Sequence, residues 1–174
     1  RGNPSEGLLP VHGSTSTMSI DLFRKKLADP YSCHSLLWPT RQLFDKQWEI
    51  VESVRDNYQP FVQAGNKLGK DRVAGFIAVH GFLTHHTVRI VTTSVKDDHL
   101  RVLWSEIMGY ISTSSLPLNS LHGGPLLCNH REIKKLIHGS PCEVSYLIGS
   151  VSERGEGMAG HHADWTLGIV DEAS

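Results

Sequence analysis

The chain has 174 residues, of which 39% are hydrophobic and 20% charged, a composition typical of one folded globular domain. Its 17 basic and 18 acidic residues leave a formal net charge of −1 at pH 7, which excludes a strongly basic protein that binds nucleic acid by bulk charge alone. No apolar run approaches the roughly 20 residues that cross a bilayer, so we expect no membrane-spanning segment. Three scattered cysteines, Cys33, Cys128 and Cys142, do not have the pattern of a disulfide framework and favour a reducing compartment.

The first half of the chain is expected to contain a tail and three helices. Residues 1–19 are rich in Gly, Pro, Ser and Thr and are predicted to form a flexible tail. Apolar residues at helical spacing predict a short helix over 20–27 and another over about 44–57. The apolar pair Phe61-Val62 is interpreted as a short strand that enters a glycine-rich turn. A nearly continuous apolar pattern over 71–85 then predicts a buried helix.

Strands and helices alternate in the second half. Ser94, followed by Asp97 three positions later, resembles the capping box that starts a helix, and the apolar stripe behind it is expected to lie in the core. The region 112–141 is consistent with short strands or a brief helix. Strands are expected over 88–91, 146–148 and 166–170. The alternation predicts an α/β domain over 20–174 with a mainly parallel sheet flanked by helices.

Residues 64–71 resemble the phosphate-binding loop of nucleotide-binding enzymes. Glycines let the backbone wrap around phosphate oxygens, amides at a helix start point at the anion, and a lysine reaches the terminal phosphates. Two positions depart from G-x-x-x-x-G-K-[ST]: Ala64 replaces the first glycine, and Asp71 replaces the hydroxyl residue that would bind Mg²⁺. Asp71 still offers an oxygen ligand, although its charge repels triphosphate. An ordinary surface turn is the alternative. The predicted ATP-binding residues here are Ala64, Gly65, Asn66, Lys67, Leu68, Gly69, Lys70 and Asp71.

An apolar strand that ends in two acids lies near the end of the sequence, at residues 166–172. In phosphate-loop enzymes the first acid, here Asp171, orients Mg²⁺, and the second, Glu172, polarises the water that attacks the γ-phosphate. A strand with a solvated acidic end is the alternative. Because α/β sheets bind ligands at the carboxyl ends of their strands, the loop and the acidic pair support each other. We expect Lys70 and Glu172 to be catalytic and Asp171 and Asp71 to be metal ligands.

Other candidates are single side chains. An amide can pair with both N6 and N7 of adenine, so Gln47 is a candidate adenine-binding residue with Trp48 or Phe44 nearby. An exposed helix residue is its alternative. Three hydroxyl residues at a predicted strand end are candidates for contact with a DNA phosphate, but a simple helix cap is favoured: Thr92, Thr93 and Ser94. The histidine pairs at 85–86 and 161–162 lack the spacing of a structural zinc site, although His161 precedes the acidic strand and is a candidate sensor of nucleotide or DNA.

From about residue 38 to residue 174, the chain resembles the ATPase domain of the large terminase subunit of tailed bacteriophages, the motor that packages DNA. Terminase phosphate loops often carry a basic residue before Leu-Gly-Lys, as Lys67 does here. The other motifs that carry the resemblance are Phe44-Asp45-Lys46-Gln47-Trp48, Val91-Thr92-Thr93-Ser94, Gly160-His161-His162 and Ile169-Val170-Asp171-Glu172-Ala173-Ser174.

The resemblance implies a P-loop NTPase core of the ASCE type, with ATP and Mg²⁺ as cofactors and double-stranded DNA as substrate. The implied partners are the portal protein, the small terminase subunit and further copies of the chain in a ring, at the procapsid portal in the bacterial host cytoplasm. In this family a coupling strand and a nuclease domain follow the acidic pair, so the chain is expected to be a fragment of the motor that ends before them. It is then expected to hydrolyse ATP poorly on its own and to expose an unpaired strand edge.

Two other functions fit the same motifs. Helicase-like ATPases carry the same order of Gln, Gly-Lys and Asp-Glu-Ala-Ser and translocate on nucleic acid without packaging it. A truncated, inactive remnant is the third hypothesis, which the substitution at Asp71 favours.

Overall fold

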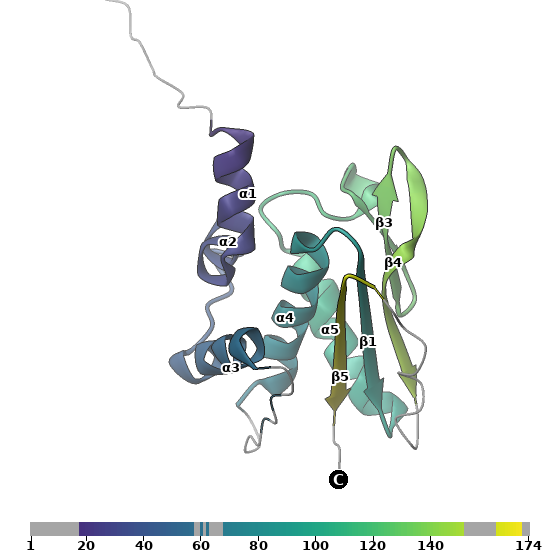
Figure 1. Cartoon of the computed structure of the whole chain (residues 1–174). Coiled ribbons are helices and arrows are strands. Elements are labelled where there is room, and N and C mark those ends of the chain that lie inside the picture. Colours follow the sequence, from purple (N-terminus) through teal and green to yellow (C-terminus); the bar gives the residue numbers. More distant parts are fainter. Residues whose placement is uncertain (1–17, 58–59, 61, 63–67, 152–162, 172–174) are drawn as a thin grey trace, which may run out of the picture.

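The computed structural model describes residues 18–57, 60, 62, 68–151 and 163–171, and it shows an α/β domain with one sheet and helices packed against it (Figure 1). Several predictions fall outside the described residues. They concern most of the tail, Phe61, the loop residues Ala64, Gly65, Asn66 and Lys67, the segment 152–162 with His161, and Glu172. Within the described ranges, no helix is long and apolar enough to span a membrane.

Three helices precede the phosphate-loop region: α1 (Ile20–Ala28), α2 (Pro30–Leu37) and α3 (Asp45–Asp56). The predictions of α1 and α3 are confirmed, whereas α2 was not predicted. The Asp29-Pro30 pair ends α1 and also begins α2. The Asp29 carboxylate accepts a hydrogen bond from the Ser32 N–H at 2.8 Å, and Pro30 occupies the first helical position, where no N–H is needed.

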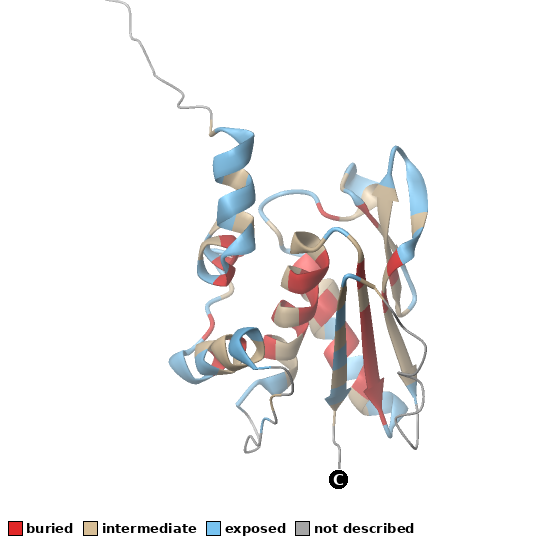
Figure 2. Cartoon of the chain, viewed as in Figure 1, coloured by how far each residue is buried: buried red, intermediate tan, exposed pale blue. Residues whose placement is uncertain are grey.

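The helices α4 (Lys70–Thr84) and α5 (Asp97–Ser112) pack against each other and against the sheet, and they carry much of the buried surface (Figure 2). Gly75 allows their close approach, since a Cβ atom there would lie 3.1 Å from the Glu106 Cβ and 3.2 Å from the Ile107 N. The predicted apolar stripe of α5 is confirmed as core. Its buried members are Leu100, Leu103, Trp104, Ile107 and Ile111.

The sheet has five strands in the order β2-β3-β4-β1-β5. Their bounds are β1 (Val88–Ser94), β2 (Leu126–Asn129), β3 (Glu132–Ile137), β4 (Ser140–Val151) and β5 (Trp165–Asp171), with a short 3-10 helix, η1 (Ser120–His122), before β2. The strands β4, β1 and β5 are parallel, as expected, but β2 and β3 extend the sheet antiparallel, so the sheet is mixed. Among the described strands, β5 pairs only with β1 and forms one edge.

The region 112–141, for which the sequence allowed short strands or a brief helix, contains the antiparallel strands β2 and β3. A local turn explains the pairing of β3 with β4. The turn between β3 and β4 places His138 and Gly139 at φ values of 50° and 81°. Two consecutive residues with positive φ are the conformation that joins tightly paired antiparallel strands, and Gly is favoured there. The Lys135 ammonium, at a register irregularity in β3, then donates to the carbonyl of His85 at the end of α4 and ties these strands to the helix.

Two local predictions are corrected. Val62 lies outside any strand and is partly exposed, so the described residues do not include the strand predicted for Phe61-Val62. Two apolar residues after Pro60, which has no N–H to donate, supply little to hold a strand in a sheet. Ser94 does not cap α5: it is the last residue of β1, and Lys96 occupies the N-cap position.

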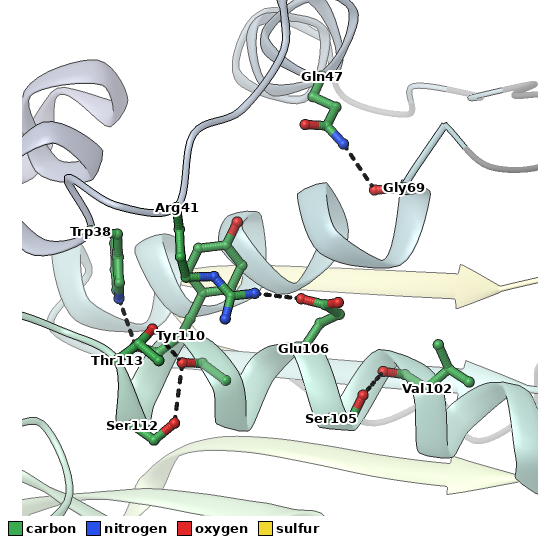
Figure 3. Close-up of polar contacts among 11 residues, drawn as sticks. Trp38, Arg41, Gln47, Gly69, Val102, Ser105, Glu106, Tyr110, Ser112 and Thr113 are labelled. Carbon is green, nitrogen blue, oxygen red and sulfur yellow. Dashed lines mark hydrogen bonds and ion pairs between the residues drawn. The ribbon is translucent and has the colours of Figure 1, made fainter.

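An aromatic cluster joins the N-terminal helices to α4 and α5. The Trp38 indole N–H donates to the Tyr110 carbonyl at 2.6 Å, and the Arg41 guanidinium forms a 2.5 Å ion pair with Glu106 (Figure 3). The Phe76 ring packs edge-on against Trp38 and Trp48. These contacts fix α3 against α4, and therefore set the position of Gln47 relative to the start of α4.

Candidate functional site

The candidate site lies where the parallel strands end and α4 begins. In Figure 1 the arrowheads of β1 and β5 point to the same end of the molecule at which α4 starts. The first-turn amides of a helix have no partners within the helix, and their dipoles favour an anion. Lys70 and Asp71 occupy this first turn, Ser94 ends β1, and Asp171 ends β5.

Lys70 and Asp171 form an ion pair at this edge, with 3.0 Å between the Lys70 Nζ and the Asp171 Oδ1. The Asp171 side chain is only 10% exposed, whereas that of Lys70 is 45% exposed. A carboxylate removed from water requires a cation or hydrogen-bond donors, and Lys70 provides the charge. The pairing brings the two predicted phosphate- and metal-binding residues within contact distance of each other.

Asp71 lies close to the same pair. Burial raises the pKa of the Asp71 carboxyl above its ordinary value, and the negative charge of Asp171 raises it further, while Lys70 acts in the opposite direction. Two carboxylates close enough to repel each other are an arrangement that a divalent cation relieves. No group of three or more His, Cys, Asp or Glu side chains gathers within the described ranges. Mg²⁺, however, commonly takes one or two carboxylates together with phosphate oxygens, so Asp71 and Asp171 fit that ion.

Gln47, the third helical residue of α3, contacts Leu68 and Gly69, which form the end of the predicted phosphate loop. Its side-chain nitrogen donates to the carbonyl oxygens of Leu68 at 3.0 Å and Gly69 at 3.3 Å, and its side-chain oxygen accepts from the Phe44 N–H at 3.1 Å. Figure 3 shows the contact with Gly69. The amide is 3% exposed, so it is not the exposed helix residue of the alternative interpretation. In this conformation both ends of the amide are engaged with the backbone rather than directed at a ligand.

Gly69 makes this contact possible. It caps α4 with a φ of 66°, in the left-handed region that favours glycine. A Cβ atom at this position would lie 2.7 Å from the Gln47 Nε2. The glycine before Lys70 therefore serves both the backbone turn and the approach of Gln47.

The aromatic neighbours proposed for adenine differ in their surroundings. The Trp48 ring stacks on Tyr31 with centroids 4.1 Å apart, within the aromatic cluster. The Phe44 ring is 69% exposed at the start of α3. Phe44 thus remains accessible beside the loop, whereas one face of Trp48 is covered.

The three hydroxyl residues that end β1 are all buried, which does not favour contact with a DNA phosphate. The Thr92 hydroxyl accepts from the Trp104 indole N–H at 2.9 Å and donates to the Ile148 carbonyl at 3.1 Å. Within the described part of the chain, the hydroxyls of Thr93 and Ser94 have no hydrogen-bond partner. Ser94 was a sequence candidate for contact with a DNA phosphate or for a helix cap, but no local signal predicted that it pairs with Asp171 of β5.

Comparison of the chain with protein-family models, with curated proteins and with solved structures found no match. The terminase resemblance therefore rests on the sequence motifs alone.

Proposed function

We propose that this chain is the ATP-binding part of a DNA-packaging motor of the terminase type, with a P-loop NTPase core. The observation that carries the proposal is the 3.0 Å contact between Lys70 and Asp171. These are the residues assigned from sequence motifs to the phosphates and to the metal, and they come from separate elements, α4 and β5.

The geometry supports a defined role for each residue. An arriving polyphosphate draws the Lys70 ammonium away from Asp171, because several phosphate oxygens offer more negative charge than one carboxylate. The first-turn amides of α4 donate to the same anion. Asp171, released from Lys70, and Asp71 are the residues that would hold Mg²⁺, which when bound supplies positive charge to offset the charge that develops on the phosphate oxygens.

Gln47 contributes by fixing the backbone just before Lys70. Its two contacts hold the carbonyl groups of Leu68 and Gly69 and so limit the paths that the loop can take. A backbone that is already fixed at Leu68 and Gly69 loses less conformational entropy there when an anion binds. Double-stranded DNA, the portal protein, the small terminase subunit and the ring assembly belong to the proposal through the resemblance alone.

Isothermal titration calorimetry with ATP and Mg²⁺ tests the proposal. We expect the wild-type chain to bind ATP and Lys70→Ala to lose at least tenfold in affinity, because a lost charged contact to phosphate is worth about 1.5–3 kcal/mol. Lys46→Ala is the matched control: it removes a lysine that forms a 2.8 Å ion pair with Glu49 on the surface of α3. Equal affinity in wild type and Lys70→Ala, or loss of affinity in Lys46→Ala to the same extent, contradicts the proposal.

A further inference from the structure

Ser94 carries a hydroxyl group whose burial the fold alone does not explain. The residue is 1% exposed, and its Oγ atom has no hydrogen-bond partner among the residues that the structure describes. Buried hydroxyl groups in folded proteins are nearly always paired, because desolvation without a partner costs free energy. A buried hydroxyl at the end of a strand that is unpaired within the described residues therefore indicates a partner outside the contacts that the structure describes.

The strand register places Ser94 beside Asp171. Ser94 of β1 is the parallel partner of Asp171 of β5, in the same register that pairs Ile90 with Leu167. Paired residues on neighbouring strands project from the same face of the sheet, about 4.8 Å apart. Ile90 belongs to the core under the helices, and side chains alternate along a strand, so Ser94 and Asp171 both project toward the face that α4 and α5 cover.

Asp171 has a cation partner that ligand binding would remove. In the present conformation its Oδ1 atom contacts Lys70 at 3.0 Å. Once an anion draws Lys70 away, or a divalent cation displaces this half-exposed lysine, the carboxylate needs another donor to fix its orientation toward the metal. Carboxylates that bind metals are commonly oriented by hydrogen bonds from neighbouring side chains.

We propose that Ser94 is a positioning residue for a divalent-cation site at Asp171, where its hydroxyl donates to the carboxylate and fixes the oxygen presented to the cation. This inference rests on the proposed function, since it assumes that Asp171 binds the metal. In the predicted phosphate loop, Asp71 stands where the motif has a Ser or Thr hydroxyl. Ser94 would supply a hydroxyl group at the same edge of the sheet.

The neighbouring residue supplies a matched control. Thr93 is 2% exposed, and its hydroxyl also lacks a partner in the described ranges, but successive residues of a strand point to opposite faces. Thr93→Val therefore removes a hydroxyl of equal burial from the face away from Asp171. Only Ser94→Ala removes a hydroxyl that lies next to the carboxylate.

The test measures binding of Mn²⁺ alone, without nucleotide, from the electron paramagnetic resonance signal of the free ion. Mn²⁺ takes the oxygen ligands that suit Mg²⁺. We expect the wild-type chain to bind Mn²⁺ and Asp171→Asn to lose binding. The affinity should fall about 10–100-fold in Ser94→Ala, the usual effect of removing such a hydrogen bond. Thr93→Val should bind as the wild type does, and Ser94→Thr, which keeps the hydroxyl, should retain most of the affinity.

Thermal unfolding separates positioning from a structural role. If Ser94 only supports the fold, Ser94→Ala lowers the melting temperature. If Ser94 positions Asp171, the variant melts at or above the wild-type temperature, because the substitution removes an unpaired buried hydroxyl. Wild-type Mn²⁺ affinity in Ser94→Ala, no Mn²⁺ binding by the wild-type chain, or loss of affinity together with a lowered melting temperature overturns the inference.

The two proposals fail in different ways. Mn²⁺ binding that depends on Ser94, in a chain that binds no ATP, contradicts the proposed function and supports the positioning role. ATP binding that depends on Lys70, with Mn²⁺ affinity indifferent to Ser94, supports the proposed function and overturns the positioning role.

Discussion

The contact between Gln47 and the end of the phosphate loop can be broken by a substitution that changes almost no volume. Gln47→Glu keeps an oxygen that can accept from the Phe44 N–H but replaces the nitrogen that donates to the carbonyls of Leu68 and Gly69. The new carboxylate oxygen would face two carbonyl oxygens that lie 3.0 and 3.3 Å from the present nitrogen. Repulsion then replaces two hydrogen bonds.

The expected cost follows from these contacts. Each hydrogen bond contributes about 1 kcal/mol net, and a buried group left without its partner costs about 1–3 kcal/mol. Leu68 and Gly69 are exposed enough for water to reach their carbonyls, which limits the penalty on that side. We therefore expect Gln47→Glu to lower the free energy of unfolding by about 2–3 kcal/mol.

Urea denaturation at neutral pH measures the loss, and amide hydrogen exchange locates it. Exchange should accelerate most in the first turn of α4, next to Gly69. Gln42→Glu is the control, since it makes the same chemical change at an exposed position shortly before α3. Its effect should stay within about 0.5 kcal/mol, as for most surface substitutions. If Gln47→Glu is as stable as Gln42→Glu, the hydrogen bonds from Gln47 to Leu68 and Gly69 do not stabilise the fold. That result would favour a role for Gln47 in binding a nucleotide base only.

Two further predictions concern the core. Gly149→Ala should cost about 2 kcal/mol or more, because its Cβ atom would lie 2.2 Å from the Trp104 Nε1 and displace the indole from Thr92. Chemical denaturation measures this loss, and a cost under about 0.5 kcal/mol, typical of harmless surface changes, would contradict it. Burial lowers the pKa of His34 and of His80 below 6.5, so the unfolded chain takes up protons first as the pH falls. The free energy of unfolding should therefore be highest above pH 6.5 and decrease below it, and the decrease should be smaller in His80→Gln. Urea denaturation at pH 7.5 and 6.0 measures both decreases. An equal decrease in the variant and the wild type would contradict the assignment to His80.

Some local signals in the sequence have more than one structural outcome. The Asp29-Pro30 pair ends α1 and also begins α2, because an aspartate before a proline satisfies the requirements of a helix start. Ser94 has the spacing of a capping box, yet its backbone continues β1, since the hydrogen bonds of a parallel sheet extend to that residue on both sides. In the first case one local pattern supplies both structures, whereas in the second the pairing of Ser94 with β4 and β5 selects the strand over the helix cap.

The sequence by itself predicted the helices α1, α3, α4 and α5, the strands β1 and β5 and residues 146–148 of β4, because the apolar period that forms each element lies within the element. Lys70, Asp171 and Gln47 were also identified as site candidates from local motifs. Only the tertiary structure decided the strand order, the antiparallel addition of β2 and β3, the 3.0 Å contact between Lys70 and Asp171, and the place of Ser94 beside that carboxylate. The physical reason is that a helix is stabilised by bonds between residues four positions apart, whereas strand order, register and the meeting of charges depend on contacts between segments far apart in the chain.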